Sequence, residues 1–233
     1  MNTLLISQLT AHLLADFNFQ PQQWCDVKDC KIISKAHLQH SLVVFVCSWI
    51  FSFTLAFGWM ALLIFLFHVV IDITKTYLSR KEIWEKHLFF IDQFLHLASI
   101  VFVVWLFCEW NGANYSMPVS TQQAFILFAL VACAKPANIF IKKYMEMKGV
   151  ISAKKEENTL MNAGRIIGSL ERILSFCLIA FNQFAAVGFI IAAKSILRFR
   201  DKDTAKTEYV LIGSLLSFGI AILLGITYQC IIF

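Results

Sequence analysis

Long hydrophobic runs separated by short polar stretches dominate the chain. One run extends from Trp59 to Leu78, which at about 1.5 Å per residue is long enough to cross a bilayer. Comparable runs recur to the end of the sequence. They predict an all-α, polytopic integral membrane protein, a helical bundle with about eight membrane segments. The expected segments are 3–17, 36–57, 59–78, 88–107, 124–144, 161–181, 184–198 and 208–232.

The breaks between these runs predict how the chain is divided. Residues 20–35 are expected to form a polar loop, and Gly58–Trp59 and Asn182–Gln183 to form tight connections. Residues 109–123 contain Gly and Pro but no Lys or Arg, which is typical of a boundary loop. We therefore expect a His/Asp-rich four-helix membrane domain at 1–110 and a C-terminal four-helix membrane domain at 120–233. Lys135–Pro136 interrupts the fifth run and predicts a proline kink, with a broken transporter-type helix as the alternative.

The composition assigns the chain to the membrane proteins. Hydrophobic residues make up 59% of it and charged residues 15%, whereas a soluble domain carries about 25% charged residues. The N-terminal residues lack the basic region and the cleavage site of a signal peptide. The net charge of +5 does not indicate nucleic-acid binding, because the Lys and Arg residues lie in short loops.

The distribution of these basic residues predicts the orientation. Nearly all of them lie in 20–35, 79–87, 142–158 and 198–206, and the connections at 58–59, 109–123 and 182–183 contain none. Positively charged loops remain on the cytoplasmic side. We therefore expect a multi-pass protein of the cell inner membrane, with cytoplasmic basic loops and both termini on the opposite side.

Histidine and aspartate recur in pairs four residues apart within the first half. The pairs are His12/Asp16, His68/Asp72 and Asp92/His96, and each pair shares one face of a helix. Ionisable groups at membrane depth are costly and mark functional sites. At about 1.5 Å per residue, the predicted orientation places these pairs and His40 in one layer roughly 5–16 Å from the cytoplasmic end.

Imidazole and carboxylate groups together are typical ligands of zinc, manganese or iron. The sequence thus predicts a divalent transition-metal site with one or two ions. Its expected ligands are His12, Asp16, His40, His68, Asp72, Asp92 and His96. Asp72 or Asp92 would act as general base and Lys75 would polarise the electrophile. The alternative is a set of His–Asp hydrogen bonds that only hold the helices together.

Several motifs in the first hundred residues occur in an order that resembles a known family, a domain of unknown function in bacterial inner-membrane proteins. They are His12-x3-Asp16-Phe17-x2-Gln20, then Trp24, Lys35 and His40, then His68-x3-Asp72-x2-Lys75 and Asp92-Gln93-x2-His96. The resemblance implies a helical membrane fold and supplies no established activity. A weaker likeness is to membrane-bound metal-dependent hydrolases, which also place His and Asp on short helices.

Charged residues also interrupt the apolar runs of the second half. A basic pocket for a phosphate-bearing headgroup or a nucleotide is one interpretation. Snorkelling side chains with one buried ion pair are the other. The expected substrate-binding residues are Arg165, Glu171, Arg172, Lys194 and Arg198.

Three functions fit these patterns. The first is a metal-dependent membrane hydrolase whose site lies near the cytoplasmic face and acts on a lipid-linked or phosphorylated substrate. The second is a metal- or proton-coupled transporter that uses the same polar layer as its pathway. The third is a metal-binding sensory subunit that binds a soluble cytoplasmic partner through its basic loops.

Overall fold

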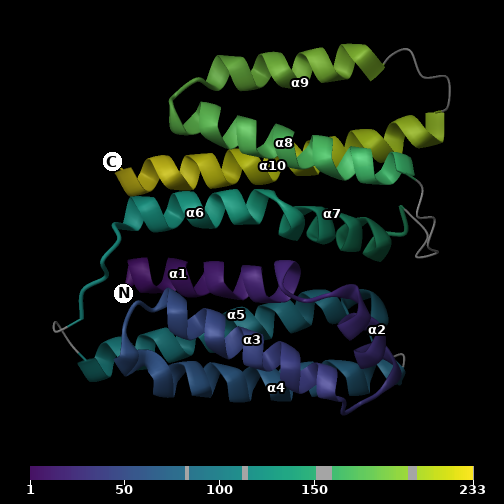
Figure 1. Cartoon of the computed structure of the whole chain (residues 1–233). Coiled ribbons are helices and arrows are strands. Elements are labelled where there is room, and N and C mark those ends of the chain that lie inside the picture. The colour runs from purple at the N-terminus through teal and green to yellow at the C-terminus, as the bar shows by residue number, and fades with distance from the viewer. Residues whose placement is uncertain (82–83, 112–114, 151–158, 199–203, 233) are drawn as a thin grey trace. The chain divides into compact units, whose positions relative to one another are not determined.

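The computed structural model describes residues 1–81, 84–111, 115–150, 159–198 and 204–232. Within these ranges the regular secondary structure is entirely helical, so the all-α prediction is confirmed (Figure 1). The chain forms two compact units, residues 1–128 and residues 129–233.

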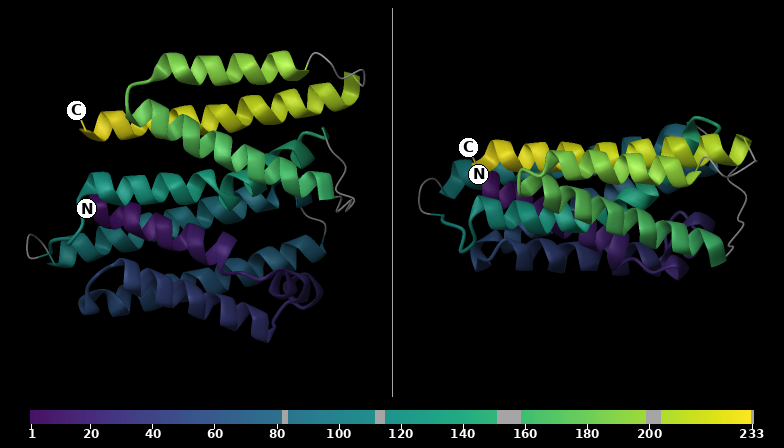
Figure 2. Two further views of the ribbon diagram at one scale, coloured as in Figure 1. Left: turned by 45° about the horizontal axis from the view of Figure 1, so that its top comes forward. Right: turned by 90° about the horizontal axis from the view of Figure 1, so that it is seen from above.

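The first unit is built on a four-helix bundle. Helix α1 contacts α3, α3 contacts α4, α4 contacts α5, and α5 contacts α1, so the four helices enclose a common interior (Figures 1 and 2). The short helix α2 packs on α3 and α4. The elements are α1 (Asn2–Leu13), the π-helical turn η1 (Leu14–Asn18), α2 (Gln22–Cys30), α3 (Lys35–Phe51), the 3-10 turn η2 (Leu55–Phe57), α4 (Gly58–Arg80), α5 (Glu85–Asn111) and the start of α6 (Thr121–Cys133).

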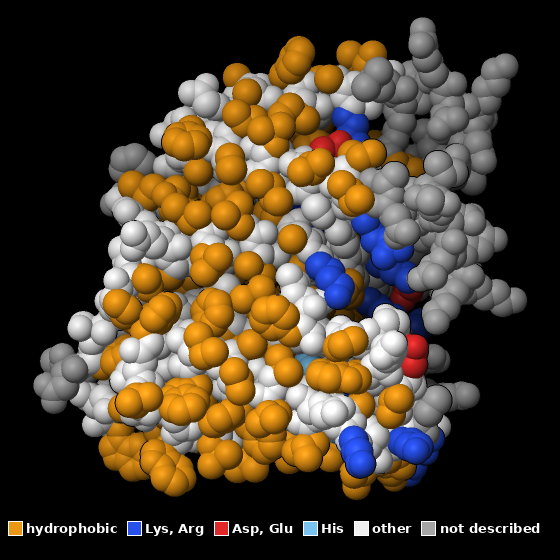
Figure 3. Space-filling model, in the orientation of Figure 1, with side chains coloured by type: hydrophobic (Ala, Val, Ile, Leu, Met, Phe, Trp, Pro, Cys, Tyr) orange, Lys and Arg blue, Asp and Glu red, His pale blue; other side chains and the backbone are white. Residues whose placement is uncertain are grey.

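The bundle is apolar both inside and outside. Its interior contains a hydrophobic cluster in which Phe57 and Phe107 meet edge to face at 5.0 Å between ring centroids. Large apolar side chains also point outward, such as Trp59 at 80% exposure and Phe94 at 70%. Hydrophobic side chains are spread over the face of this unit that is in view (Figure 3). Helices that are apolar on all sides are typical of proteins within a membrane.

Fewer helices can cross a bilayer than the sequence predicts. Three are long and apolar enough among the described residues, at Leu55–Arg80, Lys86–Asn111 and Val210–Ile232. The pair α6 and α7 (Lys135–Met147) makes a fourth if its 48° bend lies within one span. The prediction of eight membrane segments is therefore not supported. Helices α1, α3 and α9 (Phe184–Arg198) have only 12, 17 and 15 residues, and a span needs about 20.

Two expected connections differ locally from the structure. The predicted polar loop 20–35 contains helix α2, which begins directly after its N-cap residue, Pro21. The turn predicted at Gly58–Trp59 occurs earlier. The hydroxyl of Ser52 donates to the carbonyl of Trp49 and accepts from the N–H of Thr54, and these bonds end α3. Gly58 is instead the first residue of α4.

The second unit contains α7, α8 (Thr159–Ala180), α9 and α10 (Thr204–Ile232), with α8 packed on the other three helices. The break predicted at Asn182–Gln183 is confirmed, and Asn182 adopts a left-handed φ of 59° there. Helices α8 and α10 approach closely at Gly225, where an added Cβ would lie 2.6 Å from Ile179 Cγ2. Small residues at such crossings are typical of membrane helix pairs.

Candidate metal centre

The seven predicted metal ligands lie together in the interior of the first unit. They come from α1 and η1 (His12, Asp16), α3 (His40), α4 (His68, Asp72) and α5 (Asp92, His96). Each histidine is no more than 3% exposed. The spacing of four residues turns both members of each pair inward from one helix. Asp16 sits in the π-helical turn, an irregularity that is frequent at functional sites.

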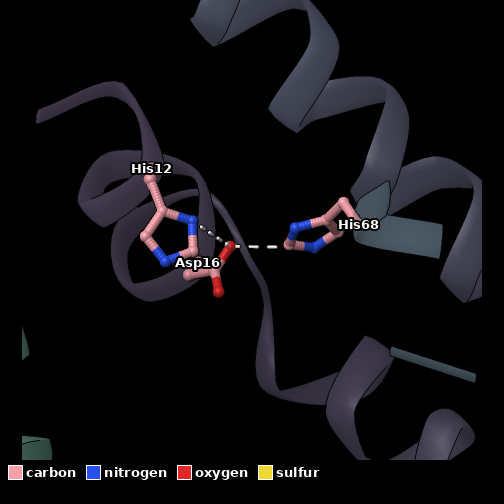
Figure 4. Close-up of side chains that lie close together, drawn as sticks. All are labelled: His12, Asp16 and His68. Carbon is pink, nitrogen blue, oxygen red and sulfur yellow. Dashed lines mark ion pairs between the residues drawn. The ribbon is translucent and has the colours of Figure 1, made fainter. Parts of the chain in front are cut away.

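Asp16 lies at the centre of three imidazoles. Its Oδ1 atom is 3.5 Å from His12 Nδ1, 3.4 Å from His40 Nε2 and 3.8 Å from His68 Nε2. Figure 4 shows His12 and His68 on two sides of this carboxylate. Two ligand atoms bound about 2.1 Å from a tetrahedral ion are about 3.4 Å apart. His12, Asp16 and His68 each offer one ligand atom within 4.8 Å of the other two, so these three side chains have the spacing of ligands around one shared ion.

A second group of potential ligands continues from the first. One ligand atom each from Asp72, Asp92 and His96 lies within 4.8 Å of the others, as does one each from His40, His68 and Asp72. Asp92 Oδ1 is 3.4 Å from His96 Nε2, and the His68 and His96 rings stack at 4.1 Å between centroids. Because adjacent groups share His68 and Asp72, the cluster suits either one ion or two neighbouring ions.

Unsatisfied polar atoms are concentrated in this cluster. Among the described residues, nine buried side-chain nitrogen or oxygen atoms have no hydrogen-bond partner, and seven of them belong to predicted ligands. Such an atom costs about 1–3 kcal/mol, and native proteins contain few. A cation bound by lone pairs would satisfy ring nitrogens and carboxylate oxygens together, so these residues fit a divalent transition metal. The atoms are His12 Nδ1 and Nε2, Asp16 Oδ1, His40 Nδ1, His68 Nε2, Asp92 Oδ1 and His96 Nε2.

The carboxylates of Asp16 and Asp92 each use their two oxygens differently. Asp92 Oδ2 accepts hydrogen bonds from Lys75 Nζ at 2.8 Å and from Gln93 Nε2 at 3.2 Å. The same Gln93 nitrogen donates to Asp16 Oδ2 at 3.4 Å. In both residues the remaining Oδ1 faces imidazole nitrogens. Outer hydrogen bonds that orient ligands in this way are a general feature of metal sites.

The electrostatic environment favours the protonation states that bind metal. Asp16 and His12 lie outside the candidate membrane-spanning helices. Burial alone would raise the pKa of the Asp16 carboxyl, yet His12, His68 and His40 hold that pKa well below its usual range. Burial also lowers the pKa of His12, although Asp16 partly opposes this effect. An ionised carboxylate and a neutral imidazole are the forms that coordinate a metal.

Two further residues extend the cluster toward α2. Lys28, only 7% exposed, forms an ion pair with Asp72 Oδ2. In the amide orientation that satisfies both neighbours, Gln20 donates to the Asp16 carbonyl at 3.0 Å and accepts from Lys28 Nζ at 3.2 Å. Gln20 belongs to the first motif, but no sequence signal distinguished Lys28 from the other lysines of the expected loop. Burial by α2 is what sets it apart.

His37 belongs to a different set of contacts. Its Nδ1 lies 2.9 Å from Ser34 Oγ and its Nε2 lies 3.2 Å from Thr76 Oγ1. Both ring nitrogens therefore have partners, one at the residue that precedes α3 and one on α4. This histidine serves the packing of the two helices.

Arg172 of the second unit contacts both sides of the break between α6 and α7. Helix α6 ends at Cys133, and Pro136 cannot donate to the preceding turn. Arg172, 1% exposed, donates to the Cys133 carbonyl at 2.7 Å, to Asn138 Oδ1 at 2.6 Å and to Ser217 Oγ at 2.8 Å. Its guanidinium thus replaces backbone hydrogen bonds that the break removes, and this geometry favours a structural role.

The other charged residues predicted for the second half have separate surroundings. Glu171 and Lys194 form an ion pair between α8 and α9. The side chain of Arg165 is exposed on α8. Arg198 ends α9, and its side chain lies outside the described residues. The phosphate-binding pocket predicted from these residues stays a prediction.

The fold and the buried cluster define a helical protein with membrane-type surfaces and a His/Asp-lined interior. Residues 4–126 match the family described as a protein of unknown function (DUF3307), and the chain belongs to this family. The predicted membership in a family of unknown function is thereby confirmed. The matched range contains every residue of the cluster from His12 to His96. No curated protein and no solved structure matches the chain.

Proposed function

We propose that the first unit binds one or two divalent transition-metal ions and that the protein is a membrane-embedded, metal-dependent hydrolase. The observation that carries this proposal is the set of seven unsatisfied buried atoms on six predicted ligands. Two of these atoms, Asp16 Oδ1 and Asp92 Oδ1, lie 3.4 Å from His40 Nε2 and His96 Nε2 respectively. A purely structural network would satisfy Asp16 Oδ1 and Asp92 Oδ1 with well-formed hydrogen bonds, whereas both oxygens lack a partner.

The chain's own residues would divide the work as follows. His12, Asp16, His40, His68, Asp72, Asp92 and His96 would hold the metal. Zinc, manganese or iron in such a site supplies a water whose pKa is lowered toward about 7. Asp72 would accept a proton as general base, Asp92 would orient Lys75 through their 2.8 Å bond, and Lys75 would polarise the electrophile.

The surroundings support a membrane-associated substrate. The outward faces of α4 and α5 are apolar, and two lysines lie beside the carboxylates of the cluster. A lipid-linked or phosphorylated substrate fits both features. Placement in the inner membrane, with the basic segments and the site toward the cytoplasm, belongs to the same proposal and is supported by the distribution of Lys and Arg.

Elemental analysis of the purified full-length protein tests the metal. We expect stoichiometric transition metal in the wild type and its loss in Asp16→Asn, which keeps the side-chain volume but removes the charge. Ser48→Ala is the control, because it removes a buried hydroxyl bonded to Gln8 in the same unit. A metal-free wild type, or an Asp16→Asn variant with full metal content, would refute the proposed site.

Turnover is measured separately. The metal-loaded protein should hydrolyse a phosphoester such as p-nitrophenyl phosphate, and a chelator should abolish this activity. Metal that is bound without any turnover of phosphoesters would favour the transporter or the sensory subunit over the hydrolase.

A further inference from the structure

Two ammonium groups, one buried and one partly exposed, border the candidate metal centre. Lys28 reaches Asp72 from α2, and Lys75 on α4 reaches Asp92 at 2.8 Å. The two carboxylates are neighbours, because one oxygen of each belongs to the same group of atoms within 4.8 Å. The lysines therefore converge on one part of the cluster.

The charges of this region favour a bound anion once a metal is present. Three carboxylates and two ammonium groups leave one net negative charge on the cluster. A divalent ion turns this into one positive charge, and a second ion turns it into three. Net charge in a buried site is strongly unfavourable unless it is paired. A phosphate group brings about one to two negative charges and several acceptor oxygens.

The lysines also have the donors that such a group needs. An ammonium has three N–H donors. The contacts described above use two of them in Lys28 and one in Lys75. The Lys75 side chain is 37% exposed and the Lys28 side chain 9%, so the subsite is open on the Lys75 side and closed by α2. Lysine is a common phosphate ligand.

We propose that Lys28 and Lys75 form an anion subsite that binds the phosphate group of a ligand beside the metal centre. This inference rests on the proposed function, since the charge balance requires a metal in the cluster. It narrows the substrate of that function to a ligand that carries a phosphate group, and it assigns a binding residue, Lys28, that lies outside the histidine and aspartate motifs.

The test uses full-length, metal-loaded protein in detergent, with metal content measured before each titration. Inorganic phosphate is titrated by calorimetry into the wild type and into Lys28→Met, Lys28→Arg and Lys31→Met. We expect Lys28→Met to weaken phosphate binding at least roughly ten-fold, as loss of a charge-assisted hydrogen bond implies. Lys28→Arg should restore most of it. Lys31→Met, an exposed lysine at the end of α2, should bind like the wild type.

A second arm distinguishes the source of the phosphate group. Mixed micelles that contain phosphatidic acid are compared with micelles of phosphatidylcholine. Lys28-dependent binding of inorganic phosphate supports a soluble phosphate ligand, and Lys28-dependent binding of phosphatidic acid alone supports a lipid headgroup. Both results support the subsite.

Three results would overturn the inference. If the metal-loaded wild type binds neither probe, the anion subsite is refuted while the proposed metal site is unaffected. Lys28→Met that binds metal more tightly and phosphate unchanged shows that Lys28 is only a counter-ion of Asp72. A wild type without metal refutes the proposed function, and the subsite falls with it.

Discussion

Gln93 connects the two carboxylates of the cluster without being a metal ligand itself. Its amide nitrogen lies 3.4 Å from Asp16 Oδ2 and 3.2 Å from Asp92 Oδ2. Gln93→Met keeps the length of the side chain and removes both donors. We expect the carboxylates to lose their orientation and the metal to bind more weakly.

The size of this effect follows from the two hydrogen bonds. Both are long for bonds to a charged acceptor, so about 1 kcal/mol for each is appropriate. Together they amount to about 2 kcal/mol, which corresponds to a roughly 30-fold weaker metal affinity. This value lies within the 10- to 100-fold range that is typical of residues orienting metal ligands.

The affinity is measured by competition with a fluorescent zinc chelator in detergent. Gln39→Met is the matched control, because Gln39 is exposed on α3 next to the ligand His40. Circular dichroism of both variants checks that the helices are retained. If Gln93→Met binds zinc as tightly as the wild type, or if both variants weaken equally, the orienting role of Gln93 is refuted.

Three more predictions concern stability. Arg172→Met removes five polar contacts and, at about 0.6 kcal/mol for each, should lower the unfolding free energy by about 3 kcal/mol. An unchanged unfolding midpoint in a denaturing-detergent titration would contradict this. Gly225→Ala should lower the unfolding free energy by about 1–3 kcal/mol, because it forces a methyl group against Ile179. Gly219→Ala on the same helix meets nothing within 4 Å and should be neutral or stabilising in the same titration, so equal effects of the two substitutions would refute the packing argument. Zinc at about one hundred times its dissociation constant should raise the free energy of unfolding by about 2.7 kcal/mol, and a chelator should reverse this gain. A thermal unfolding midpoint that does not respond to zinc would count against the site.

The helical class, the membrane-type surface and the pairing of histidine with aspartate were predictable from local sequence. A spacing of four residues puts two side chains on one face of any helix, whatever the helix packs against. The pairs His12/Asp16, His68/Asp72 and Asp92/His96 are therefore evident in the sequence. The break at Asn182 was predictable for a similar reason, because polar residues end an apolar run at a defined place.

The number of membrane spans was not predictable from hydropathy alone. An apolar run shows that a helix is hydrophobic but not that it crosses the bilayer: α9 has the bounds of the expected segment 184–198, yet its 15 residues are fewer than a span needs. The helices in the expected segments 3–17 and 36–57 are shorter than those segments, with 12 and 17 residues. Helix α2 was missed because nine mostly polar residues have little helical tendency in isolation. A helix this short depends on its packing, here against α3 and α4.

The atoms that face the interior were decided only by the tertiary structure. The sequence places Lys28 in a polar segment and Gln93 beside Asp92, but it does not state what either side chain contacts. The rotation and packing of α2, α3, α4 and α5 bring Lys28 to Asp72 and place Gln93 between two carboxylates. Local periodicity selects a helix face, whereas the neighbouring helices determine which oxygen of Asp16 or Asp92 is held from outside and which faces the imidazoles.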